Sequence, residues 1–118
     1  MSVLNQYKVK FVVRNLFNTN VKSILTISDM LSAYITDLNT ANKVNQLLND
    51  ITEVLNHIHP LGGGQTQSTY LAHITATETK IYQDMEEWEE NNNIQPDFTL
   101  PTSDFKVIVE AWRDYLQQ

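Results

Sequence analysis

The chain contains no cysteine. It also contains no run of consecutive apolar residues that approaches the length of a transmembrane helix. The lack of cysteine excludes a disulfide scaffold, a cysteine-based zinc site and thiol catalysis. The lack of a long apolar run excludes a membrane-spanning helix, which needs about 20 apolar residues. The first residues also lack the basic start and the apolar run of a signal peptide. We therefore expect a cytoplasmic protein with no membrane contact.

Basic side chains are also scarce, with 8 Lys and Arg against 14 Asp and Glu and a net charge of −6. A protein that binds free nucleic acid needs a stripe of Lys and Arg to release counterions, and the sequence has none. We therefore expect no direct contact with nucleic acid. The acidic residues are concentrated in one segment, which we call the acidic run: Asp84, Glu86, Glu87, Glu89 and Glu90. This run is either a solvated face that aids solubility or a surface complementary to a basic partner.

The chain has 118 residues, which fits one domain over residues 1–118. Apolar residues make up 42% of it, too large a share for a disordered chain. Residues 7–14 alternate between two faces, as a half-buried strand does, and residues 15–20 suggest a turn or a helix entry. From Val21 to Leu38 apolar residues recur every three or four positions, which predicts a helix, although residues 24–27 could also form a short strand.

A polar break with several capping residues follows, and residues 44–58 then carry the periodicity of an amphipathic helix. Gly62, Gly63 and Gly64 predict a flexible loop. For the remaining chain we expect strands at about 68–76, 79–84 and 97–100, a loop at 89–95, and a last helix after Pro101 with caps from Thr102, Ser103 and Asp104. A helix from Thr79 is an alternative to the second of these strands. The order strand, helix, helix, strands, helix predicts an α+β fold with a small antiparallel sheet packed against about three helices.

No residue pattern indicates catalysis or a bound metal. A zinc site needs three or four converging ligands, and His57 and His59 would point in different directions on a helix. His73 lies alone in a predicted strand. The glycine run lacks the lysine of a phosphate-binding loop, and a dense exposed set of carboxylates does not favour the buried acid of a glycosidase. We expect a structural or surface role for the histidines, no cofactor and no enzymatic activity.

Two tryptophans have different patterns. Trp112 lies on the apolar stripe of the last helix and is predicted to be in the core. Trp88 lies inside the acidic run, where it either anchors an interface or packs this segment onto the core.

The C-terminal segment carries a recurring pattern. Leu100-Pro101 ends a short strand, Asp104-Phe105 opens a helix shortly afterwards, and Trp112 lies near the end of that helix. This arrangement resembles the end of many small bacterial immunity proteins, which are encoded beside toxins of polymorphic or contact-dependent growth-inhibition systems. The preceding strand with Lys80-Ile81-Tyr82 is similar to the strand that those proteins place before the loop.

The resemblance implies that the chain neutralises a cognate toxin domain by tight, stoichiometric binding. Such toxins are often nucleases with basic grooves, and an acidic inhibitor can occupy such a groove. We therefore expect the acidic run to contact the toxin with Trp88 as its anchor, and we expect no small-molecule substrate. The alternative is a small adaptor or structural protein-interaction module that has no toxin partner.

Overall fold

A computed structural model describes residues 2–118 and confirms the α+β class, with five helices and two antiparallel sheets in this range. The helices are α1 (Val3–Gln6), α2 (Asp29–Thr36), α3 (Ala41–Leu55), α4 (Met85–Glu90) and α5 (Thr102–Leu116). The strands are β1 (Lys10–Leu16), β2 (Thr19–Leu25), β3 (Gly62–Gln65), β4 (Leu71–Ile74), β5 (Glu78–Tyr82) and β6 (Phe98–Pro101). Strands β1 and β2 form a separate hairpin, and the other four form a sheet in the order β3-β4-β5-β6. No helix in residues 2–118 is long and apolar enough to cross a membrane.

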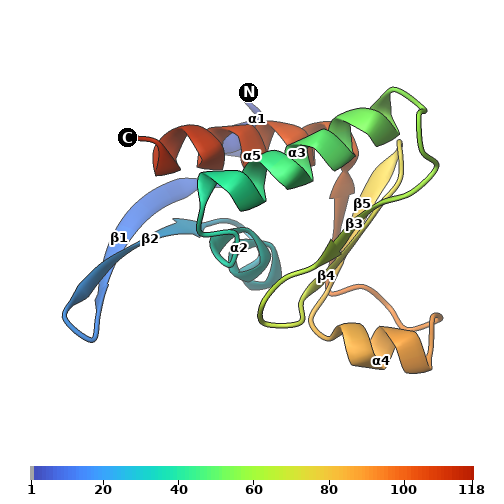
Figure 1. Cartoon of the computed structure of the whole chain (residues 1–118), viewed down its shortest axis with the longest axis horizontal. Helices are drawn as coiled ribbons and strands as arrows, with labels where there is room; N and C mark the ends of the chain where they lie inside the picture. The colour runs from blue at the N-terminus through green and yellow to red at the C-terminus, as the bar shows by residue number, and fades with distance from the viewer. Residues whose placement is uncertain (1) are drawn as a thin grey trace.

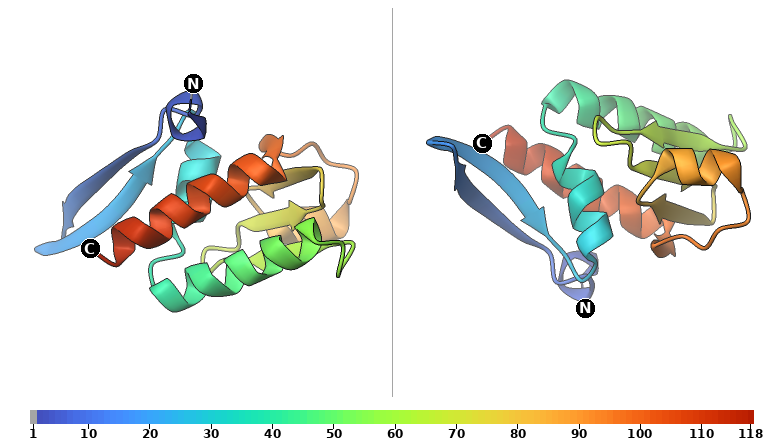
Figure 2. Two further views of the ribbon diagram at one scale, coloured as in Figure 1. Left: turned by 90° about the horizontal axis from the view of Figure 1, so that it is seen from above. Right: turned by 90° about the horizontal axis from the view of Figure 1, so that it is seen from below.

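The long helices α3 and α5 lie side by side over one face of the four-stranded sheet (Figures 1 and 2). Alternate residues of the strands turn toward them, so that Ala72, Ile74 and Ile81 are buried. Helix α3 begins at the cap Thr40, whose side chain accepts a hydrogen bond from the Lys43 N–H, and its apolar stripe is buried. The predicted helix over residues 44–58 is therefore confirmed for most of its length. Trp112 of α5 is fully buried, as predicted.

The prediction of a helix from Val21 is wrong over residues 21–25, which form β2. Each residue of β1 pairs with one of β2, from Lys10 opposite Leu25 to Leu16 opposite Thr19. The helix α2 begins only at Asp29. Its N-cap is Ser28, whose side chain accepts a hydrogen bond from the Leu31 N–H. The pairing of β2 with β1 outweighs the helical spacing of Ile24 and Leu25. The alternative of a short strand at residues 24–27 is correct for residues 24 and 25.

Two further predictions need correction. The glycine run is not a flexible loop, because Gly62, Gly63 and Gly64 belong to β3 and pair with β4. The predicted strand at about 79–84 is confirmed as β5, which ends at Tyr82, and the alternative of a helix from Thr79 is wrong. A helix begins only at Met85, as α4, and it replaces the start of the predicted 89–95 loop. The other two predicted strands, now β4 and β6, are confirmed with shorter bounds.

The predicted caps of the last helix are also wrong. Helix α5 follows Pro101 directly, without a side-chain cap. Thr102 is buried instead, and its Oγ1 donates to the Thr75 carbonyl oxygen at 2.6 Å and lies 2.9 Å from Thr79 Oγ1. This hydroxyl pair fixes the start of α5 to the sheet, a role that a solvent-facing cap does not have.

Tyr7 connects the N-terminal segment to α5 and gives a testable pH dependence. Its hydroxyl donates to Asp104 Oδ2 at 2.7 Å. Burial, this hydrogen bond and the negative charge of Asp104 raise the pKa of Tyr7 from 10.0 to about 12. The folded state therefore holds the phenol proton more tightly than the unfolded chain does. The stabilising contribution is complete below pH 10 and is lost as the pH rises toward 12.

We expect Tyr7→Phe to lower the free energy of unfolding at pH 8 by about 1–2 kcal/mol, because a hydrogen bond to a charged group is lost. Between pH 9 and about pH 11.5 the variant should lose less stability than the native chain. Urea unfolding followed by circular dichroism across this range measures both effects. Parallel curves for the two proteins would show that Tyr7 does not titrate with folding.

Candidate protein-binding surface

The acidic run lies on and beside α4, which covers the face of the sheet opposite to α3 and α5 (Figure 1). Asp84 is the N-cap of this helix, and its Oδ1 accepts a hydrogen bond from the Glu86 N–H at 2.9 Å. The Met85 N–H donates to the Thr69 carbonyl oxygen at 2.9 Å, and Asn92 Nδ2 donates to the Trp88 carbonyl oxygen at 2.6 Å. The bond to Thr69 attaches the start of this six-residue helix to the segment before β4, whereas the bonds of Asp84 and Asn92 are local caps at its two ends.

The four glutamates of α4 are all exposed, and Asp84 is partly exposed. Among residues 2–118, none of these five carboxylates lies within ion-pair distance of a basic side chain. The structure therefore brings all the predicted acidic residues onto one short element, where their charges are not neutralised by neighbours. This arrangement presents a concentrated negative field to solvent.

The placement of charge along α4 does not favour the helix itself. Glu86 and Glu87 lie in the first turn, where negative charge interacts well with the helix dipole. Glu89 and Glu90 lie at the opposite end, where negative charge is unfavourable, and no basic residue occupies the last turn. Glu86 and Glu90 are also four residues apart, a spacing at which like charges repel. The glutamates at the end of the helix, Glu89 and Glu90, therefore cost α4 some stability, while Glu86 and Glu87 favour its start.

Trp88 is half-buried and packs toward the sheet. Its ring centre lies 5.9 Å from that of His73 and 6.4 Å from that of Tyr82. These contacts support the packing role, and the exposed part of the indole remains beside the glutamates. Burial, followed by the nearby charge of Lys80, lowers the pKa of His73, which keeps this imidazole neutral near pH 7.

The other histidines lie far from this surface in the sequence and are exposed. His59 Nε2 lies 3.1 Å from Glu53 Oε2 at the end of α3. No group of three or more His, Asp or Glu side chains in residues 2–118 could hold a metal ion. The absence of enzymatic activity and of a cofactor stays a prediction.

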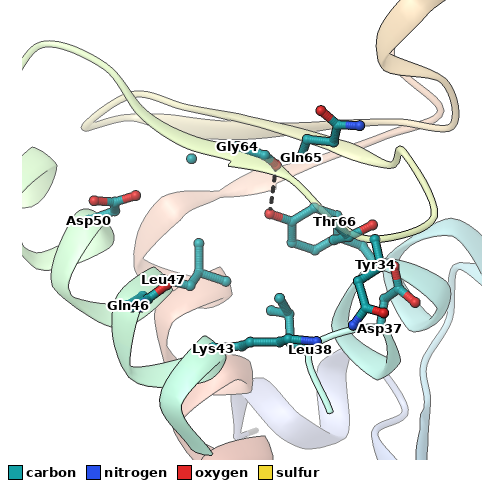
Figure 3. Close-up of a pocket in the computed structure, with 12 residues that line it drawn as sticks. Tyr34, Asp37, Leu38, Lys43, Gln46, Leu47, Asp50, Gly64, Gln65 and Thr66 are labelled. Atoms are coloured by element: carbon teal, nitrogen blue, oxygen red, sulfur yellow. Dashed lines mark hydrogen bonds between the residues drawn. The ribbon is translucent and has the colours of Figure 1, made fainter. Parts of the chain in front are cut away.

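Several small pockets lie on the surface of the molecule. One pocket of about 230 Å³ lies between α3 and β3, where Tyr34 donates a hydrogen bond to the Gly64 carbonyl oxygen (Figure 3). Thr66 lines this pocket, and its buried Oγ1 has no hydrogen-bond partner within the described range 2–118. A second pocket of about 280 Å³ is lined by Asp29, Met30, Ala33, Tyr70, Gln83 and Asp97. Neither pocket is lined by a histidine or by a member of the acidic run.

One conspicuous surface residue, Phe17, was not predicted from the sequence. It lies in the turn between β1 and β2 and is fully exposed, at 100%. The available signal is an aromatic residue between Leu16 and Asn18 in a segment rich in turn formers, for which the residue pattern predicts only a turn or a helix entry.

Comparisons with known proteins do not assign this fold or surface to a family. No family model, curated protein or solved structure matches the chain.

Proposed function

We propose that this chain is an immunity protein that binds a toxin domain and neutralises it by stoichiometric protein–protein inhibition. The observation that carries the proposal is the acidic run on α4. Its glutamates are exposed and unpaired within residues 2–118, and two of them, Glu89 and Glu90, lie at the end of the helix where negative charge is unfavourable. Exposed charges at positions that do not help the helix are better explained by what they bind than by what they do for folding.

The charge of the run suggests the chemistry of the partner. A nuclease groove is lined by basic side chains that contact phosphates, and carboxylates can take the places of those phosphates. Between Lys80 and Lys106 the chain has seven acidic residues and no basic one, so the whole segment around α4 opposes a basic groove. The similarity of the C-terminal segment to small immunity proteins supports the same class of partner. We propose a basic nuclease domain as the toxin.

The direct test is co-expression with the protein encoded immediately upstream of this chain, which the proposal predicts to be a large secreted protein whose variable C-terminal domain is lethal when expressed alone. We expect the native chain to restore growth. The triple variant Glu86→Lys, Glu87→Lys, Glu89→Lys should lose protection and bind the purified toxin domain at least about a hundredfold more weakly, because like charges then face each other. Growth assays and isothermal titration calorimetry measure the two effects.

A matched control separates this surface from net charge. Asp50→Lys, Glu53→Lys, Asp114→Lys makes the same change in charge away from α4, at two exposed carboxylates and the partly exposed Glu53. We expect this variant to protect fully. Association of the native pair should also slow as salt is raised, because exposed charges are screened. Full protection by the α4 variant would remove the acidic run from the mechanism. Failure of the native chain to protect would favour an adaptor without a toxin partner.

A further inference from the structure

The β1–β2 hairpin forms an arm that extends away from the helices and the four-stranded sheet (Figures 1 and 2). Its base is fixed, because the Phe11 ring stacks on Tyr115 with 4.8 Å between ring centres. Lys22 Nζ also donates to the carbonyl oxygens of Tyr115 and Gln118, each at 2.9 Å. The arm is therefore attached to the end of α5, and its tip is presented at a defined position.

The tip carries an apolar group in a conformation that does not favour it. Phe17 and Asn18 have φ angles of 51° and 64°, in the left-handed region that glycine and asparagine adopt more readily than phenylalanine. Phe17 is completely exposed, and Leu16 and Val13 are 49% and 58% exposed. A glycine at position 17 would suit the turn better, so the phenyl ring does not serve the folding of the hairpin.

The arm is also basic. Half of the chain's basic residues lie between positions 8 and 22, and no acidic residue precedes Asp29. Lys22 is used midway along the arm, opposite Val13, in the contact with the end of α5. The other three, Lys8, Lys10 and Arg14, form no ion pair with any of the described residues 2–118. The arm thus combines an aromatic tip with positive charge behind it.

The same chain has a pocket with the opposite properties. The 280 Å³ pocket beside α2 has apolar side chains of Met30, Ala33 and Tyr70 and two carboxylates, Asp29 and Asp97. Asp97 is held in place because its Oδ2 accepts a hydrogen bond from the Gln83 N–H at 2.7 Å. An apolar ring with Arg14 nearby complements a pocket that combines the apolar side chains of Met30, Ala33 and Tyr70 with the carboxylates of Asp29 and Asp97.

We propose that Phe17 of one molecule inserts into this pocket of a second copy of the chain. The tip points away from the body of its own molecule (Figures 1 and 2), so the occupant must come from another copy. Plug and pocket are different surfaces, and the contact is therefore head-to-tail. An anionic membrane is the less favoured partner, because Asn15, Asn18 and Asn20 surround the ring and would enter the lipid with it.

The proposal does not rest on the proposed function. Neither Phe17 nor the apolar pocket residues belong to the acidic run, and toxin protection is measured without reference to self-association. The two proposals can therefore fail separately.

Sedimentation velocity of the purified chain tests the contact. We expect the native chain to self-associate within a range of protein concentrations that extends to about 1 mM. The self-association should be stronger at low salt than at high salt. Phe17→Gly removes the aromatic side chain, and glycine adopts the left-handed backbone of the turn readily. Ala33→Arg fills the pocket with a long side chain, and arginine is a good helix former. Each variant alone should be monomeric, with association weakened about thirtyfold or more. Ile58→Gln, which removes another exposed apolar side chain, should associate like the native chain.

Mixing the two variants gives the decisive result. Phe17→Gly keeps a pocket and Ala33→Arg keeps a plug, so the mixture should form a dimer and nothing larger. Formation of that dimer also shows that both variants are folded. A native chain that stays monomeric up to about 1 mM, association that survives Phe17→Gly, or a mixture that remains monomeric would each overturn the proposal. So would binding of the monomer to vesicles of anionic phospholipid through Phe17 without any self-association.

Discussion

Replacing Trp112 by alanine should lower the free energy of unfolding by about 3–5 kcal/mol, a large part of the stability of a small domain. Trp112 is 0% exposed and packs among the residues of α5, α3 and the arm. Its ring centre lies 6.4 Å from that of Phe11 and 5.9 Å from that of Tyr115. The variant would leave a cavity where these rings meet. Thermal unfolding followed by circular dichroism should show a midpoint lowered by about 10–20 °C.

The indole N–H adds a second contribution, because Trp112 Nε1 donates to the Leu38 carbonyl oxygen at 2.8 Å. This buried bond connects α5 to the segment between α2 and α3. Trp112→Phe keeps most of the packing and removes only the donor, so we expect a smaller loss of about 1–3 kcal/mol. Trp88→Ala is the matched control, because it removes a tryptophan that is only half-buried. It should lower the free energy of unfolding by less than Trp112→Ala does. Equal losses for the two alanine variants would contradict the central role of Trp112.

The helices α3 and α5 could be predicted from the sequence because their apolar residues follow one spacing over about four turns each. That spacing by itself defines the face that is buried. The Trp112 prediction succeeded for the same reason. The acidic run could be predicted as a surface because charges at that density cannot be buried. Its helix could not be predicted with equal ease, since α4 has only six residues and begins directly after the short connection that follows β5.

The arm could not be predicted because its evidence is not local. A hairpin turn with two left-handed residues usually contains glycine, and this one is formed by Phe17 and Asn18. Residues of β2 also have apolar side chains at helical spacing, and only their pairing with β1 fixes them as a strand. Exposure of Phe17 follows from where the arm lies in space. No pattern within the segment itself indicates that it extends from the body.

The glycine run gives the second large effect, and we expect Gly63→Ala to lower the free energy of unfolding by about 2–4 kcal/mol. Gly63 has a φ of +96°, a conformation that side chains rarely adopt. A Cβ at this position would lie 2.3 Å from the Ala72 carbonyl oxygen of the neighbouring strand. Because that atom is backbone, β3 must move away from β4 to accept the methyl group. Urea unfolding of the variant measures the loss.

The two neighbouring glycines are controls of graded severity. A Cβ at Gly62 would lie 2.8 Å from Val54 Cγ2, a side-chain atom that can shift, so Gly62→Ala should cost about 1 kcal/mol. A Cβ at Gly64 meets nothing within 4 Å, so Gly64→Ala should change stability by less than about 0.5 kcal/mol. A flexible loop would tolerate alanine equally at all three positions, because no neighbour would be in a fixed place. A strand held between α3 and β4 requires unequal effects, largest at Gly63 and smallest at Gly64.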